Sequence, residues 1–201
     1  MTRTGIFGGT FSPPHRGHIR AAAAFVSEMK LDRLLVIPAC IPPHKNIDDP
    51  GPDLRLEMTR AAFSDNAGFS IPVKVSDYEI RKSGVSYTVD TLEHFSDPDT
   101  ELFLLCGGDK FECIESWREP ARIFSLASVV GIMREDGTEQ EMRKYAERYR
   151  KKYGAKCYVL GERALEVSST LLRTMIKRGE NTEEYLSPEV RRIIEREKLY
   201  R

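Results

Sequence analysis

The chain of 201 residues lacks the features that mark several classes of protein. Its four cysteines form no C-x-x-C pair and are far apart, so zinc-ligand spacing and a disulfide framework are both missing. We expect four buried, reduced thiols. The net charge is zero, from 31 basic and 31 acidic residues, which argues against a general nucleic-acid binder. Any anion site must therefore be built locally.

Long apolar runs are also missing. No stretch approaches the roughly 20 apolar residues that span a bilayer, and the N-terminus shows no apolar signal core. We therefore expect a cytoplasmic protein that contacts no membrane. The sequence does not decide the oligomeric state, and a homo-oligomer is compatible with it.

Short apolar runs alternate with amphipathic segments along the whole chain. The predicted strands are residues 4–8, 34–38, 70–75, 102–106, 128–133 and 155–159. The predicted helices are residues 17–30, 53–66, 87–95, 111–124, 138–153, 169–178 and 187–197. Strands separated by helices of this length indicate βαβ units and a parallel sheet.

This pattern predicts an α/β fold. We expect a single Rossmann-like, doubly wound domain over residues 1–201, with a mainly parallel sheet of five or six strands. A small helical C-terminal part should occupy about 165–201. In such sheets, ligands gather at the carboxyl ends of the strands.

The first predicted turn carries most of the chemical information, in the run G-I-F-G-G-T-F-S-P-P-H-R-G-H at 5–18. A buried strand ends at Gly8 and Gly9, followed by Thr10, and these glycines let a ligand approach the backbone closely. His15 and His18 are three residues apart at a helix start, so both imidazoles can point at one spot. The N–H groups and dipole there favour an anion. The run matches neither a Walker A loop nor G-x-G-x-x-G, which disfavours a dehydrogenase.

A second candidate anion site lies near the C-terminus, in Ser168-Ser169-Thr170-Leu-Leu-Arg173. Alone, this run is equally well explained as an N-cap that opens an apolar helix. Ser169 and Arg173 are four residues apart, however, and therefore share a helix face. Hydroxyls, amides of the first turn and a guanidinium would together hold phosphate groups.

The two motifs resemble the G-G-T-F-D-P-x-H-x-G-H and I-S-S-T-x-x-R signatures of the nucleotidylyltransferase superfamily. The resemblance implies that both bind the phosphates of ATP. Ser12 stands where that superfamily usually has Asp. A serine can still brace the turn by hydrogen bonding.

Three further segments bear on the second substrate. His44 and Lys45 lie on a Pro/Gly-rich loop at 41–53, whose composition suits a lid, although a solvated loop lysine is an equally good explanation. Ser86 is a natural cap for a helix that begins near Tyr87 and Thr88, whose first-turn amides would favour a carboxylate.

The third segment follows a strand that ends at Gly107 and Gly108. Strand-end glycines followed by an acidic residue, here Asp109, often contact a ribose. The single tryptophan, Trp117, would most often belong to a core.

Together these segments resemble the bacterial nicotinate mononucleotide adenylyltransferases, over essentially the whole chain. That family makes deamido-NAD and pyrophosphate from nicotinate mononucleotide and ATP. The resemblance implies that His44 and Lys45 line the mononucleotide pocket, that Tyr87 and Thr88 contact the nicotinate carboxylate, and that Trp117 stacks on the ring. Gly107 and Asp109 would contact a ribose of the nucleotide. Ala39 stands where the family often has Asn, so one pocket contact is missing.

The expected chemistry is a direct in-line attack. The phosphate of the mononucleotide has a second pKa of about 6, so it is already anionic near pH 7 and needs no general base. His15, His18 and Arg173 would stabilise charge and transfer no proton. Mg²⁺ would be held mainly by the ATP phosphates and water, since the sequence shows no dedicated acidic cage.

Other functions remain open at this point. The same scaffold also serves pantetheine-phosphate, glycerol-phosphate and nicotinamide mononucleotide types, although the late R-T-x-G-I-S-T motif of the cytidylyl branch is missing. The H-R-G-H run is similar to the H-I-G-H motif of class I aminoacyl-tRNA synthetases, but no K-M-S-K-S run accompanies it. A nucleotide sensor without turnover is the remaining alternative.

Overall fold

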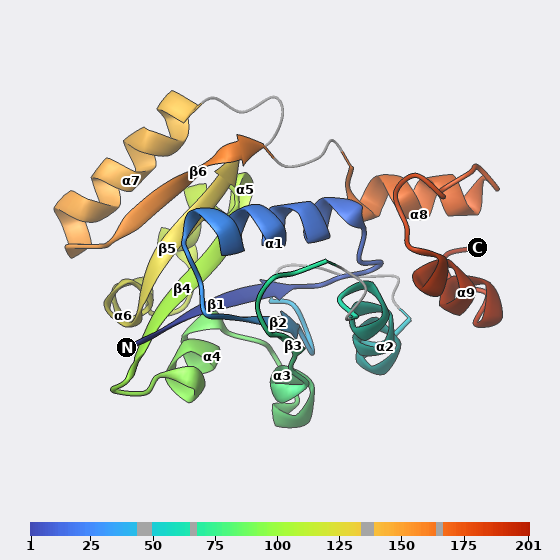
Figure 1. The fold of residues 1–201 in the computed structure, drawn as a ribbon, viewed down its shortest axis with the longest axis horizontal. Helices are drawn as coiled ribbons and strands as arrows, with labels where there is room; N and C mark the ends of the chain where they lie inside the picture. Colours follow the sequence, from blue (N-terminus) through green and yellow to red (C-terminus); the bar gives the residue numbers. More distant parts are fainter. Residues whose placement is uncertain (44–49, 65–67, 134–138, 164–166) are drawn as a thin grey trace.

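The computed structural model describes residues 1–43, 50–64, 68–133, 139–163 and 167–201. Its sheet has six strands in the order β3-β2-β1-β4-β5-β6, and every neighbouring pair is parallel (Figure 1). The strands are β1 (Thr2–Gly9), β2 (Arg33–Pro38), β3 (Val73–Val75), β4 (Thr100–Gly107), β5 (Ala127–Met133) and β6 (Cys157–Arg163). The predicted fold class is confirmed.

The described helices connect these strands and extend the chain beyond them. They are α1 (Arg16–Glu28), α2 (Pro52–Ala62), α3 (Tyr78–Lys82), α4 (Thr88–Phe95), α5 (Gly108–Glu112), α6 (Pro120–Leu126), α7 (Glu139–Tyr153), α8 (Ser169–Lys177) and α9 (Pro188–Arg196). The chain moves outward from β1 to β2 and β3, then returns to place β4 on the other side of β1. Strand order therefore reverses between β1 and β4, and this is the position where doubly wound sheets form a ligand crevice.

Both faces of the sheet are covered, because successive side chains of a strand point to opposite faces. On β1, Phe7 joins the apolar cluster under α1, whose Ala22 and Phe25 are fully buried. Its neighbour Ile6 joins the opposite cluster, which α4, α5, α6 and α7 cover. The sheet is thus buried on both sides, which explains why its strands are continuous apolar runs.

A third apolar cluster attaches the helical C-terminal part to the rest of the molecule. Met58 of α2 packs with Leu172 of α8 and with Val190 and Ile194 of α9. All four side chains are buried, and α2 and α9 lie side by side (Figure 1). This packing holds α8 beside the end of β1.

The predicted helix at 111–124 is wrong. It is divided into α5, a 3₁₀ turn (Ile114–Ser116) and α6. Pro120 begins α6, and the residue before it, Glu119, has a left-handed φ of 53°. Proline disfavours the α conformation in the preceding residue, so a continuous helix could not pass this point.

Three smaller predictions also need correction. The strand predicted at 70–75 begins only at Val73. The five-residue helix α3 was not predicted, because it is too short to show a helical period. The thiols are not all buried: Cys113 is exposed and Cys40 is half-buried, although all four cysteines are free.

We predict that Tyr149→Phe lowers the free energy of unfolding by about 1–3 kcal/mol. The Tyr149 hydroxyl is buried and donates to the carbonyls of Phe111 (2.7 Å) and Glu112 (2.9 Å) at the end of α5. Urea unfolding at pH 7 would measure the loss. The control Tyr158→Phe, at an exposed tyrosine, should change stability by less than about 0.5 kcal/mol. Equal effects of the two changes would contradict the prediction.

Candidate functional site

Glycines stand at the ends of β1 and β4, where the strand order reverses. A Cβ added to Gly8, on β1, or to Gly107, at the end of β4, would meet no atom of the described residues within 4 Å. The chain at both strand ends can therefore be approached closely by a ligand. Thr10 follows β1 and is half-buried, and Asp109 lies exposed in the first turn of α5.

The two histidines meet at the start of α1, in the segment that follows β1. Their ring centroids are 3.7 Å apart. His18 lies in α1, whereas His15 is the residue that precedes the first helical turn, so only one of the pair is helical. The backbone N–H of His15 donates to Nδ1 of His18 at 3.1 Å. Because Nδ1 accepts this bond, the proton of neutral His18 is on Nε2, which makes Nε2 a donor.

His15 is buried, with 6% of its surface exposed. Burial lowers the pKa of its imidazole to about 4, so the ring is neutral near pH 7. Its Nδ1 atom has no hydrogen-bond partner among the described residues. Gly17 is required next to it, because a Cβ there would lie 2.9 Å from that same Nδ1. An unpaired buried nitrogen costs about 1–3 kcal/mol.

The Ser168–Arg173 motif contacts the loop between β1 and α1. Ser168 caps α8, since its Oγ accepts from the Leu171 N–H at 3.1 Å. The Ser169 hydroxyl donates to the Pro13 carbonyl at 2.9 Å. Arg173 Nη1 donates to the Ser12 carbonyl, also at 2.9 Å. Segments almost 160 residues apart are therefore in direct contact beside the histidine pair.

Because of these bonds, part of the hydrogen-bonding capacity of the motif is already used within the protein and is not free for an anion. The Ser169 hydroxyl is engaged with loop backbone, and Arg173 Nη2 donates to the Thr170 hydroxyl at 3.2 Å. Thr170 and Ser168 are exposed. The motif thus holds the loop in place, while Ser168 and Thr170 in the first turn of α8 stay accessible.

The C-terminus reaches this loop as well, which the sequence did not suggest. Ser12 is buried, and its hydroxyl lies 3.1 Å from the hydroxyl of Tyr200. The Arg16 N–H donates to the Tyr185 carbonyl at 2.8 Å. The serine that departs from the superfamily pattern is therefore bonded to the last turn of the chain.

The start of α4 is held differently from the prediction. The residue before the helix is Tyr87, whose side chain makes no capping hydrogen bond. Ser86 is not the cap, because its Oγ accepts instead from the Cys40 N–H at 2.8 Å. This bond joins the segment after β2 to the start of α4, near Thr88.

Tyr87 and Trp117 belong to neighbouring segments. The guanidinium of Arg118 lies 4.8 Å from the centre of the Tyr87 ring, so the residue after Trp117 contacts the start of α4. The Trp117 side chain is half-buried against the core on this face of the sheet. His44 and Lys45, also predicted for this part of the site, lie outside the described residues.

Arg55 is a site residue that sequence reasoning missed. It lies on α2 with no exposed surface, and its guanidinium donates to the carbonyls of Thr10, Ala39 and Cys40. A signal was present, because Arg55 occupies the same helix stripe as the buried Met58 and interrupts its apolar pattern.

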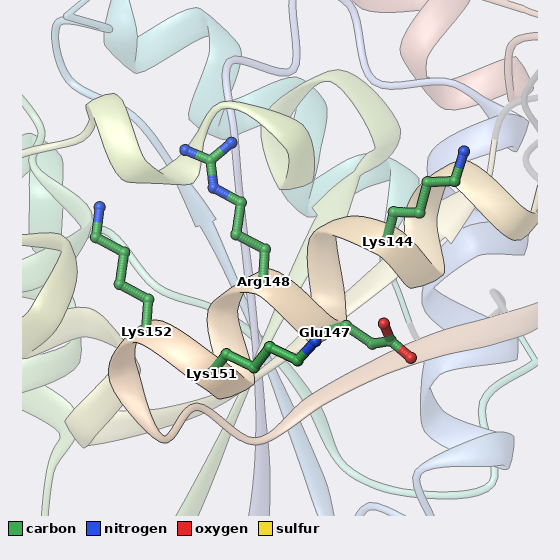
Figure 2. Close-up of a pocket in the computed structure, with 5 residues that line it drawn as sticks. All are labelled: Lys144, Glu147, Arg148, Lys151 and Lys152. Atoms are coloured by element: carbon green, nitrogen blue, oxygen red, sulfur yellow. The ribbon is translucent and has the colours of Figure 1, made fainter.

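Two shallow hollows lie away from the histidine pair, on α7 and on α9, which are at opposite ends of the molecule (Figure 1). Figure 2 shows the hollow on α7, lined by Lys144, Glu147, Arg148, Lys151 and Lys152. Arg148 and Lys152 both pair with Glu115, and Lys152 lowers the pKa of that carboxyl. Such exposed ion pairs are typical of a solvated helix face.

The described part of the chain offers neither a cluster of metal ligands nor a helix that could span a membrane. No group of three or more His, Cys, Asp or Glu side chains there could hold a metal ion. No helix among those residues is long and apolar enough to cross a membrane.

Comparison with known proteins places these features in context. A family model described as cytidylyltransferase-like matches residues 6–193. The chain is 39% identical to a probable nicotinate-nucleotide adenylyltransferase of Clostridium botulinum (strain Alaska E43 / Type E3), covering 100% of this chain and 99% of that one. It is 37% identical to a protein of the same name from Desulfitobacterium hafniense (strain Y51), covering 99% and 96%.

Solved structures share the fold. The chain superimposes on the nicotinic acid mononucleotide adenylyltransferase of Plasmodium falciparum complexed with NaAD, with a TM-score of 0.80 and 19% identity. The alignment covers 100% of this chain and 98% of that one. The same enzyme complexed with APC gives a TM-score of 0.75.

We predict that His15 makes stability depend on pH in the acid range. The pKa of His15 is about 4 in the folded state, below its ordinary value of 6.5, so the unfolded chain binds the proton more readily. The stability that the neutral ring contributes is therefore fully present above pH 6.5, and it is lost as the pH falls from 6.5 towards 4. Between pH 7 and pH 5 the loss from this group should be about 2 kcal/mol.

Urea unfolding at both pH values, for the wild type and for His15→Gln, isolates this effect from other titrating groups. The wild type should lose more stability on acidification than the variant. Parallel losses in the two proteins would show that His15 titrates normally.

Proposed function

The chain belongs to the cytidylyltransferase-like family and, within it, to the nicotinate-nucleotide adenylyltransferases, and from this we propose the reaction that its site performs. It transfers the adenylyl group of ATP to nicotinate mononucleotide, giving deamido-NAD and pyrophosphate. This is a step of NAD biosynthesis. The described part of the chain acts as one catalytic domain, and the cytoplasmic location stays a prediction.

One observation carries this proposal. The histidine pair and α8 meet at the loop that follows β1, joined by the bonds from Ser169 and Arg173 to that loop, and β1 is the strand at which the strand order reverses. Backbone amides, imidazole donors and a guanidinium there form a site suited to a polyphosphate.

We assign the ATP side to this cluster. The proposed ATP-binding residues are Gly8, Gly9, Thr10, His15, His18, Gly107, Asp109, Ser168, Ser169, Thr170 and Arg173. Gly8 and Gly107 leave room for the nucleotide. Among these residues, His15, His18 and Arg173 are assigned the catalytic role of stabilising charge.

The mononucleotide side is assigned to the start of α4 and the segment around Trp117. Tyr87 and Thr88 would receive the carboxylate, and Trp117 would stack on the ring. The Arg118 guanidinium beside Tyr87 adds a positive charge that suits the carboxylate on the ring. His44 and Lys45 complete this proposal from sequence alone.

The mechanism follows from the charges. The substrate phosphate is anionic near pH 7, with a second pKa of about 6, and attacks the α-phosphorus in line. Pyrophosphate leaves as the new P–O bond forms. His18, with its proton on Nε2, donates a hydrogen bond to phosphate oxygen, and Arg173 supplies a permanent positive charge. No side chain has to remove a proton.

We propose that Mg²⁺ binds at this site together with ATP. Since the described residues offer no cluster of three ligating side chains, the phosphates of ATP and water would provide its ligands. When bound, Mg²⁺ neutralises charge on the phosphates. The residues of the chain position the phosphate groups around it.

The test of the function is pyrophosphate release from ATP and Mg²⁺ with one candidate acceptor at a time. Nicotinate mononucleotide, nicotinamide mononucleotide, pantetheine phosphate and glycerol phosphate should be compared at equal concentrations. The proposal requires turnover with nicotinate mononucleotide and the dinucleotide as product. Faster release with pantetheine phosphate or glycerol phosphate would overturn it, as would binding of ATP without turnover.

We predict that His18→Ala lowers kcat by roughly 10²–10³, the effect of losing one hydrogen-bond donor to the transition state. The fold should remain intact, as circular dichroism would verify. His94→Ala is the matched control, because His94 stacks on Tyr78 on the outside of α4. Near-normal turnover in His18→Ala would remove His18 from the mechanism.

We also predict that kcat/KM is about 10- to 100-fold higher for nicotinate than for nicotinamide mononucleotide. The first-turn amides of α4 favour a carboxylate over a neutral amide, and charge-assisted hydrogen bonds are roughly twice as strong as neutral ones. Thr88→Val, which keeps the shape but removes the hydroxyl, should narrow the preference. Equal kcat/KM for the two substrates would place the carboxylate elsewhere.

A further inference from the structure

Arg55 is among the largest fully buried side chains of the protein. It lies in the first turns of α2, where Leu56, Met58 and Thr59 are buried as well. An arginine is seldom placed in a core, because removing its charge from water costs several kcal/mol unless strong hydrogen bonds compensate. Its bonding partners should therefore reveal what it contributes.

The guanidinium joins the ends of two adjacent strands. Nη1 donates to the Thr10 carbonyl at 3.1 Å and to the Ala39 carbonyl at 2.6 Å. Nη2 donates to the Cys40 carbonyl at 2.7 Å. Thr10 follows β1 and belongs to the proposed ATP loop, whereas Ala39 and Cys40 follow β2.

The segment after β2 is bonded in turn to the start of α4. The Cys40 N–H donates to the Ser86 hydroxyl at 2.8 Å, and the Ser86 N–H donates to the Ile41 carbonyl at 2.9 Å. Ser86 directly precedes Tyr87 and Thr88, where the nicotinate carboxylate is proposed to bind. A continuous chain of hydrogen bonds thus runs from the ATP loop through Arg55 to the mononucleotide side.

The type of residue matters for this arrangement. Arg presents a rigid, planar fork of donors, which can hold carbonyls of two segments at fixed positions. Lysine would keep the charge but offers a single flexible nitrogen. The Ala39 N–H also donates to the Gly9 carbonyl at 2.9 Å, so the two strand ends are linked at backbone level and by Arg55.

We infer that Arg55 is a positioning residue that sets the separation between the ATP loop and the mononucleotide pocket by holding the carbonyls of Thr10, Ala39 and Cys40. This inference rests on the proposed function. Arg55 contacts neither substrate. It acts by aligning the attacking phosphate behind the α-phosphorus, where a misplacement of about 1 Å can cost about 10²-fold in rate.

The first experiment measures steady-state kinetics for Arg55→Met and Arg55→Lys, with each substrate varied in turn. kcat should fall about 10- to 100-fold in Arg55→Met, while both KM values stay within about threefold of the wild type. Arg55→Lys should also lower kcat and leave both KM values nearly unchanged, but the fall in kcat should be smaller. The matched control is Arg60→Met on the same helix, where the side chain is exposed and pairs with Asp77 at 3.6 Å, and where kinetics should not change.

The second experiment measures the coupling between the two sites. Calorimetry gives the Kd of nicotinate mononucleotide with and without a non-hydrolysable ATP analogue. In the wild type the analogue should tighten binding at least about fivefold. In Arg55→Met this factor should approach one, and in Arg55→Lys it should fall by a smaller amount. If Arg55 only stabilised the fold, the folded molecules of each variant would still bind nicotinate mononucleotide more tightly in the presence of the ATP analogue.

The outcomes separate the inference from the proposed function. If the wild type binds no nicotinate mononucleotide, the function itself fails. If the wild type binds and turns over but the Arg55 variants keep full coupling and normal kcat per folded molecule, only the inference is overturned. A loss confined to KM would also overturn it. Should Arg55→Met not fold, Arg55→Lys decides the question by the same measurements.

Discussion

Two backbone carbonyl groups, those of Ser12 and Pro13, connect the two ends of this polypeptide. Both residues are buried, so their carbonyls need hydrogen-bond donors, and they receive them from Arg173 and Ser169 of α8. Neither donor exists near the loop unless the helical C-terminal part packs on α2. The apolar cluster around Met58 and Leu172 provides that packing. The proposed catalytic arrangement therefore depends on a hydrophobic contact that involves none of the proposed site residues.

Local spacing made part of the site predictable. Two histidines three residues apart at a helix start had to share one side, and their rings lie together. Ser168 was predictable as a cap, because a hydroxyl before an apolar helix satisfies free N–H groups. The alternation of apolar runs with helical segments likewise predicted the parallel sheet. Each of these depends on residues that are close in sequence.

The remaining features depend on contacts between distant residues. Ser86 was a plausible cap, but the Cys40 N–H, 46 residues away, takes its hydroxyl. Tyr200 contacts Ser12 only because α9 returns the chain to the loop. Arg55 could be detected as a break in an apolar stripe. Its role could not be inferred without knowing which carbonyls accept its hydrogen bonds. Pro120 alone was a local signal that the helix prediction overlooked.

A protein with no net charge can still bind a polyphosphate, and the burial of its donors explains how. His15 is kept neutral by its surroundings, so it costs no charge desolvation while the site holds no ligand. His18 contributes an N–H without a positive charge. Arg173 carries the charge that both lack, at a half-buried position where the Ser12 carbonyl and the Thr170 hydroxyl already orient it. In the proposed site, recognition of phosphate would combine neutral donors with the Arg173 guanidinium, and a large basic surface is not required.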